Sequence, residues 1–182
     1  LGNTFLKTSI TYSFRKYYKV FRQYNFRLFI GKFIRNNSKN NNYDFSTSSI
    51  SDYTYSSNLL GRSESEGFFS QQYFKNDAGF KSKIYPSFSN DYVISLNSGI
   101  TIWKWLEGYF DYGFFKNKDE KLKTGYDTGL KLNIVENYLE LYFPVLNSEK
   151  YILNSKNYSK NIRFTLSLDP ENLTSLFTRR WF

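Results

Sequence analysis

The sequence contains no cysteine and no histidine, and these two absences exclude several kinds of chemistry. Without cysteine the chain has no disulfide framework, no thiol nucleophile and no thiolate metal site. Without histidine these residues cannot form a histidine general base, a Ser-His-Asp triad or an H-E-x-x-H zinc site. We therefore predict no catalytic, cofactor-binding or metal-binding residue within the chain.

Methionine is absent as well, and the chain begins Leu1-Gly2-Asn3. These residues do not start the basic segment and apolar segment of a signal peptide. Both observations predict that the chain is the C-terminal fragment of a longer precursor.

Long apolar runs are also missing. No run approaches the ~20 apolar residues that a membrane-spanning helix needs. If the chain enters a membrane, it therefore crosses as strands. The mean hydropathy of −0.57 agrees with this interpretation, because only one face of each strand in a membrane barrel contacts lipid.

Aromatic residues and cations are abundant. Phe, Tyr and Trp make up 21% of the chain, and 25 Lys and Arg against 16 Asp and Glu give a formal net charge of +9. Aromatic girdles are typical of membrane barrels. The positive charge is weaker evidence, because an AT-rich genome also favours lysine codons. No recognisable nucleic-acid motif accompanies it, so no nucleic-acid partner is expected.

Apolar and polar residues alternate along much of the chain. In residues 139–145 the odd positions Leu139, Leu141, Phe143 and Val145 are all apolar. A period of two predicts strands with one apolar and one polar face. The same alternation predicts seven to nine strands in all, and the clearest of the others cover residues 6–14, 24–30, 92–102, 106–115, 124–134 and 162–168.

The segments between these strands carry turn and loop signals. Residues 36–58 are rich in Asn, Ser, Thr and Tyr and predict a long polar loop, with a domain linker as the alternative. Residues 116–121 predict a charged loop, and residues 15–19 a rim or turn. A strand is expected to begin within residues 69–74. Residues 79–85 predict a short strand, which Pro86 ends.

The C-terminus has two possible structures. Asp169 followed by Pro170 and Glu171 predicts a short helix with an Asp N-cap. Alternatively, residues 175–182 form a terminal strand. The sequence leaves both open.

The polar faces of the predicted strands carry charge. Glu107, Asp111, Asp127 and Lys131 are predicted to face a water-filled lumen, while the apolar faces contact lipid. The second strand also carries Arg27 on its polar face, which a soluble core would seldom accept. Indoles suit a membrane interface, so Trp103 and Trp105 are expected there or, alternatively, in a packed core.

Other candidate sites are weak. The glycines Gly61 and Gly67 lack both the spacing and the lysine of a phosphate-binding loop. Glu64 and Glu66 could form an acid pair, but exposed loop carboxylates are the ordinary case. Neither motif supports catalysis.

Several motifs in order resemble the C-terminal region of large Bacteroidetes outer-membrane metallopeptidases of the aminopeptidase-N-like (gluzincin) family. The resemblance covers roughly residue 59 to the end. It rests on Gly61-Arg62-Ser63-Glu64, Phe69-Ser70-Gln71-Gln72, Ile102-Trp103-Lys104-Trp105, Asp111-Tyr112-Gly113, Tyr126-Asp127-Thr128-Gly129-Leu130-Lys131-Leu132-Asn133, Leu139-Glu140-Leu141-Tyr142-Phe143-Pro144 and residues 173–182.

This resemblance implies a zinc aminopeptidase domain upstream, anchored by the present chain. No catalytic residue carries over, because the family's zinc site needs histidines that this chain lacks. Asp111-Tyr112-Gly113 and the terminal Phe182 are also similar to the last barrel strands of the surface-antigen outer-membrane assembly family. That similarity concerns how a barrel is built and is no evidence of activity.

Together these observations predict an all-β fold: one antiparallel outer-membrane β-barrel domain over residues 1–182, with long polar loops. Its expected partners are bacterial outer-membrane lipid and the barrel-assembly machinery, which could recognise the terminal Trp181 and Phe182. Two alternatives remain. One is the barrel of a surface-antigen-type assembly or transport protein, and the other is a soluble basic β-sandwich that binds nucleic acid or glycans.

Overall fold

The fold is all-β. A computed structural model describes residues 4–20, 22–37, 43–48, 67–135 and 138–166. Within these residues the strands are β1 (Phe5–Lys19), β2 (Arg22–Asn36), β3 (Phe45–Ser46), β4 (Phe88–Ser89), β5 (Tyr92–Trp103), β6 (Leu106–Lys116), β7 (Lys123–Val135), β8 (Leu139–Asn147) and β9 (Arg163–Leu166). Two short 3-10 helices accompany them, η2 (Phe69–Gln71) and η3 (Tyr158–Asn161).

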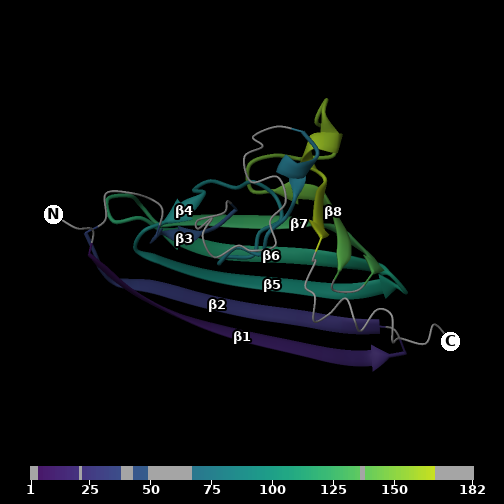
Figure 1. Cartoon of the computed structure of the whole chain (residues 1–182), viewed down its shortest axis with the longest axis horizontal. Coiled ribbons are helices and arrows are strands. Elements are labelled where there is room, and N and C mark those ends of the chain that lie inside the picture. Colours follow the sequence, from purple (N-terminus) through teal and green to yellow (C-terminus); the bar gives the residue numbers. More distant parts are fainter. Residues whose placement is uncertain (1–3, 21, 38–42, 49–66, 136–137, 167–182) are drawn as a thin grey trace.

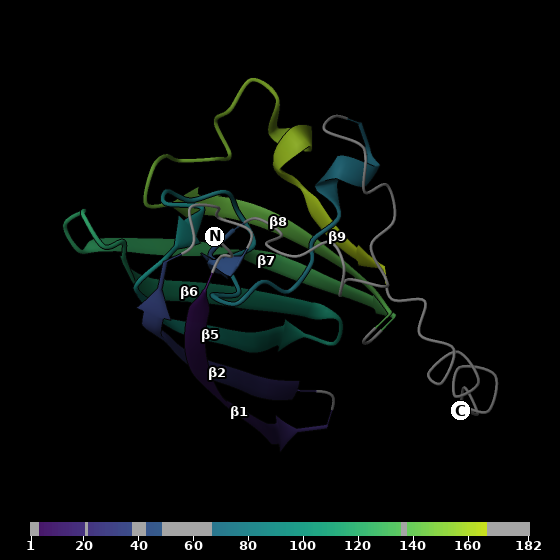
Figure 2. The same cartoon turned by 60° about the vertical axis from the view of Figure 1, so that its left-hand side comes forward.

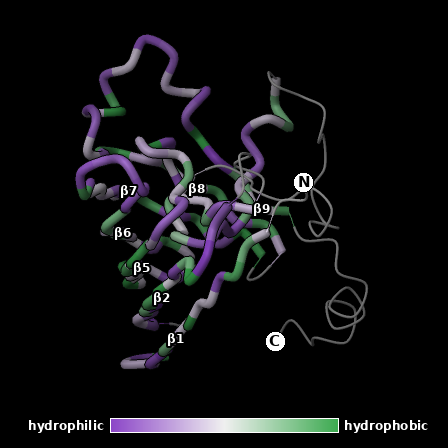
Figure 3. Tube along the Cα trace, turned by 90° about the vertical axis from the view of Figure 1, so that its left-hand side faces the viewer, coloured by the Kyte–Doolittle hydropathy of each residue, from purple (hydrophilic) through white to green (hydrophobic). Residues whose placement is uncertain are grey.

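Seven of these strands form one antiparallel sheet in the order β1-β2-β5-β6-β7-β8-β9. The sheet curls into a half-barrel with a concave and a convex face (Figures 1 and 2). Figure 3 shows the strands stacked end-on, with β1 at the bottom of the curve. The predicted all-β, antiparallel class is therefore confirmed.

The connections at the two ends of the sheet differ in length. At the right-hand end of Figure 1, β1 joins β2, β5 joins β6 and β7 joins β8 through only a few residues each. At the opposite end, β2 joins β5 through residues 37–91, and residues 117–122 and 148–162 form the other two connections. We call these the turn end and the loop end. Short turns at one end and long loops at the other are typical of membrane barrels.

The long connection between β2 and β5 covers part of the concave face. Residues 43–48 and 67–91 lie against it, and β3 pairs with β4 there to form a second, two-stranded sheet (Figure 1). We refer to these residues as the inner layer. Gly79 in this layer has a φ of +81°, and a Cβ there would lie 2.4 Å from Asn97 Oδ1. Only glycine therefore fits this close approach.

An apolar cluster joins the inner layer to the loop end of the sheet. Phe45 is buried between Phe29 and Phe33, with ring centroids 6.0 and 5.0 Å away. Phe80 packs edge-on against Phe115 at 5.5 Å. Buried Ala78, Ile84 and Val93 complete the cluster. The interior is thus closed by apolar side chains at the loop end.

The structure differs from several local predictions. Residues 15–19 continue β1 instead of forming a turn, since their backbone stays paired with β2. Residues 79–85 are not a strand, because side chains of the large sheet hold their backbone in place of a ladder. Residues 69–71 form η2.

The predicted loop 36–58 is described only in part. Within it, Phe45–Ser46 is a strand, because the apolar cluster buries the Phe45 ring. The alternative helix or strand at residues 169–182 lies outside the described residues.

Candidate functional site

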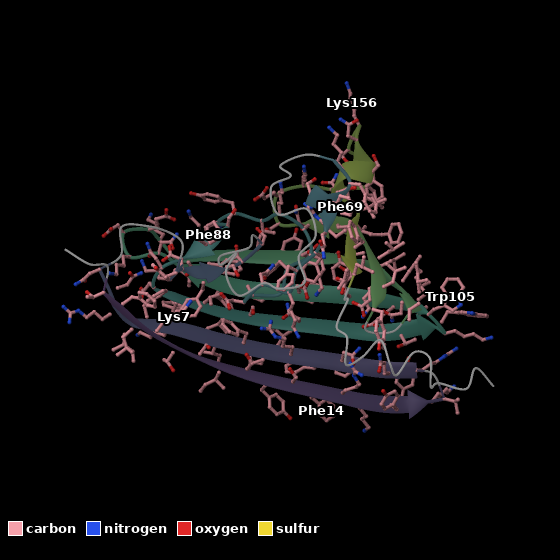
Figure 4. The ribbon with its side chains drawn as sticks, in the orientation of Figure 1. Lys7, Phe14, Phe69, Phe88, Trp105 and Lys156 are labelled. Atoms are coloured by element: carbon pink, nitrogen blue, oxygen red, sulfur yellow. The ribbon has the colours of Figure 1, made fainter. Side chains whose placement is uncertain are left out.

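The convex face is built from the apolar positions of each strand. Backbone register aligns them in rows across the sheet, because residues directly opposite one another share a face. One row runs Tyr12, Leu28, Leu96, Tyr112 and Tyr126, and a second runs Ile10, Ile30, Ile94, Phe114 and Thr124. Figure 4 shows Phe14, two positions along β1 from Tyr12, on the outer side of the curve.

Among the strand residues that the structure describes, charged side chains on this face lie only near the two ends of the strands. Lys32 and Lys116 lie at the loop end, and Lys16 lies toward the turn end. Between them, the outward positions of β5, β6 and β7 carry no charge; these positions are 94–102, 106–114 and 124–134, taken alternately. The uncharged stretch of β5 is ~26 Å long at ~3.3 Å per residue. A strand tilt of ~40° projects this to ~20 Å, close to the ~25 Å apolar band of membrane barrels.

In a soluble domain, apolar side chains are usually buried and polar ones exposed, and β5 shows the reverse over most of its length. The outward side chains Ile100 and Ile102 are each 50% exposed, whereas the inward Ser95 and Thr101 are 1% and 4% exposed. From Ser95 to Thr101, polar side chains and Gly99 therefore face the interior, and large apolar ones lie mostly on the outside. Soluble proteins seldom expose large contiguous apolar surfaces without a partner for them.

The concave face carries a row of polar side chains across five strands. Arg27, Asn97, Asp111, Asp127 and Asn147 are directly opposite one another on β2, β5, β6, β7 and β8. Arg27 donates to Asn97 Oδ1 at 2.9 Å, and the Asn97 amide donates to Asp111 Oδ1 at 3.0 Å. We call this set the polar row.

The polar row holds the inner layer through Lys81. The Lys81 ammonium lies 2.8 Å from both carboxylate oxygens of Asp111, which is fully buried. The backbone N–H groups of Lys81 and Ser82 donate to Asp127 Oδ2 at 2.9 and 2.7 Å. Asp111 and Asp127 are cross-strand neighbours and would repel each other. Lys81 therefore compensates both carboxylates at once.

The ends of the row add further anchors for the inner layer. The Asn147 amide donates to Ser82 Oγ at 3.1 Å and to the Lys83 carbonyl at 3.0 Å. Arg27 donates to the Asp77 carbonyl at 2.9 Å. Charged and amide side chains thus hold residues 77–83 of the inner layer on the sheet, in addition to the apolar cluster.

A second charged group lies nearer the turn end. Lys131 contacts Glu107 Oε2 at 3.2 Å and Glu140 Oε1 at 3.4 Å. Asn25 and Asn133 donate to the two oxygens of Glu107 at 3.1 and 3.2 Å. Glu107 is buried and has several partners, as a buried carboxylate requires.

The structure places all four sequence-predicted charges on the concave face. Asp111 and Asp127 lie in the polar row, and Glu107 and Lys131 form an ion pair. Lys81 was not predicted from the sequence. It lies in an irregular segment, in which no alternation of apolar and polar residues assigns its side chain to a face of the sheet. Trp103 ends β5 at the turn end and Trp105 follows it (Figure 4 labels Trp105); they are 59% and 55% exposed, so neither is a core residue. Trp181 and Phe182 lie outside the described residues.

A pocket of about 520 Å³ lies between the inner layer and the turn-end half of the concave face. Its lining combines cations, carboxylates and aromatic rings, including Lys75, Tyr73 and Tyr109. Lys75 is an exposed residue, yet desolvation lowers the pKa of its ammonium; the Arg27 and Lys81 charges lower that pKa further, and Glu140 raises it. Burial raises the pKa of the Tyr73 hydroxyl, so Tyr73 stays neutral.

Within the described residues no three acidic side chains gather in a way that could hold a metal ion. No helix among those residues is long and apolar enough to cross a membrane. No protein-family model, curated protein or solved structure matches the chain.

Proposed function

We propose that this chain is a segment of a bacterial outer-membrane β-barrel whose convex face contacts lipid. Its role is to anchor a larger protein in the membrane. The inward polar row and the Glu107–Lys131 pair then line the barrel interior. The inner layer occupies part of that interior, which favours an anchor over an open channel.

The observation that carries this proposal is the polarity of the curled sheet. Fully buried carboxylates lie on the concave face, and half-exposed isoleucines and aromatic rings cover the convex face. A bilayer is the environment in which such an outer face is stable, because each strand then contacts lipid with one side only. The short turns at one end and the exposed Trp103 and Trp105 there agree with a barrel rim.

The resemblance to metallopeptidases suggests what is anchored. In that proposal a zinc aminopeptidase domain precedes the barrel and performs the catalysis. Trp181 and Phe182 would then be recognised by the assembly machinery. Both statements remain predictions, as does the surface-antigen alternative.

Two leucines with similar exposure provide a matched test. Leu130 lies on the convex face and is 39% exposed, and Leu122 lies in the loop before β7 and is 49% exposed. In phosphatidylcholine vesicles, Leu130→Arg should lower the free energy of unfolding by ~2–4 kcal/mol, as arginine does near a bilayer midplane. Leu122→Arg should change it by less than ~0.5 kcal/mol. Urea titrations of vesicle-bound protein measure both values.

The wild-type chain, diluted from urea, should float with the vesicles after an alkaline wash. Equal effects of the two substitutions, with the chain remaining in the aqueous fraction, would contradict the proposal. That result would favour the soluble basic β-sandwich.

A further inference from the structure

The pocket on the concave face holds an excess of positive charge. The cations that line it are Arg15, Arg27, Lys75, Lys81 and Lys131, and the carboxylates are Glu107 and Glu140. Both carboxylates already contact Lys131, and Lys81 is paired with Asp111 below the pocket. Among the described residues, neither Arg27 nor Lys75 forms an ion pair with either of these carboxylates.

Lys75 is the clearest of these cations. Within the described part of the chain it has no hydrogen bond and no ion pair. The charges of Arg27, Lys81 and Arg15 disfavour its positive charge, and that of Glu140 favours it. An anion placed among these side chains would relieve the repulsion between their positive charges.

Two buried polar atoms of the lining residues also lack a partner. Tyr109 is 5% exposed and lines the pocket, yet its hydroxyl has no hydrogen-bond partner among the described residues. The same is true of Arg27 Nε. A buried polar group without a partner is costly. Both groups can donate a hydrogen bond, as an anion requires.

We propose that this pocket binds an organic phosphate, with the phosphate group between Arg27 and Lys75 and in hydrogen-bond reach of the Tyr109 hydroxyl. Several cations and neutral donors converge there, which suits the oxygens of a phosphate. The pocket volume of about 520 Å³ exceeds the needs of a bare ion and lies within the range of small-molecule sites. The proposal does not depend on the membrane location.

Calorimetric titration of the full chain tests the site. The protein is refolded in maltoside micelles, or in buffer alone if it stays soluble, so that the two proposals fail separately. Glucose 6-phosphate should bind saturably at one site, and glucose should not. Phosphatidic acid added to the micelles, with diacylglycerol as its neutral counterpart, distinguishes a lipid phosphate from a soluble one. Saturable binding of either phosphate supports the site and identifies the source.

Three variants connect binding to the pocket. Lys75→Gln should weaken phosphate binding about tenfold, because it removes a charge-assisted contact. Tyr109→Phe should weaken it about threefold to tenfold while leaving the fold intact, since only an unpaired hydroxyl is lost. Lys121→Gln, in the loop before β7, is the charge-matched control and should bind like the wild type. Absence of binding by both phosphates, or equal affinities in all three variants, overturns the proposal.

Discussion

Lys81 connects two buried carboxylates that would otherwise repel each other. Its ammonium pairs with Asp111 and its backbone N–H donates to Asp127. The Lys81 side chain is only 12% exposed, and its ammonium also lies 5.0 Å from the Tyr109 ring centroid. Lys81 is therefore one of the side chains that hold the inner layer on the sheet.

Asp111→Asn should lower the free energy of unfolding by ~3–5 kcal/mol, because it leaves the Lys81 ammonium buried without its carboxylate. The double variant Asp111→Asn with Lys81→Gln should recover more than half of that loss. Asp119→Asn, in an exposed loop, is the matched control and should have little effect. Urea unfolding in maltoside micelles measures all four proteins. Equal losses in the single and double variants would show that the pair is not coupled.

The sequence located most strands because alternation is a local signal. In β5, β6 and β7 each side chain faces one of two environments, so parity alone assigns the faces, and Asp111 and Asp127 were placed on the polar face in this way. The inner layer left no such signal. Its backbone is held by side chains from strands far away in sequence, such as Asp127 for Lys81. No local pattern encodes that contact.

Phe45 shows the same limit for a core residue. It lies in a segment rich in Asn and Ser, and its burial depends on Phe29 and Phe33 of β2. The glycine at position 31 makes room for it, since a Cβ there would lie 2.6 Å from Phe45 Cε1. The buried Phe45 ring therefore holds the polar segment around it against the sheet.

Phe45→Ala should lower the free energy of unfolding by ~3–5 kcal/mol, through lost contacts and the cavity that remains. It should also expose the Tyr43–Asp44 bond to chymotrypsin, which cleaves after aromatic residues, before the large sheet unfolds. Phe110→Ala removes a ring that is 44% exposed on the convex face and should cost less. Denaturant titration with time-resolved proteolysis measures both effects. If both variants lose equally, Phe45 does not hold the inner layer.

At the scale of the whole molecule, the half-barrel leaves β1 at an open edge. Within the described residues β1 pairs only with β2, and every residue of β1 is exposed. Unpaired backbone groups are not tolerated in the hydrocarbon region of a bilayer. In a membrane this edge therefore requires a further strand, from the same protein or from another copy.

The two faces of the sheet also have different consequences for the whole molecule. The convex face offers an uncharged band between end lysines, and the concave face offers buried charge and a cationic pocket. An anchor needs only the first of these. The charged concave face gives the interior a capacity to bind a ligand, which anchoring does not require.

The most direct test of the lipid-facing surface is site-directed fluorescence quenching in vesicles. The chain contains no cysteine, so single substitutions such as Ile100→Cys, Phe110→Cys and Leu130→Cys each give one labelled site on the convex face. Leu122→Cys in a loop and Lys75→Cys in the pocket are the controls. We expect doxyl-labelled lipid to quench the three convex-face labels and an aqueous quencher to reach only the two controls. Convex-face labels that respond to the aqueous quencher and not to the lipid would contradict the membrane assignment.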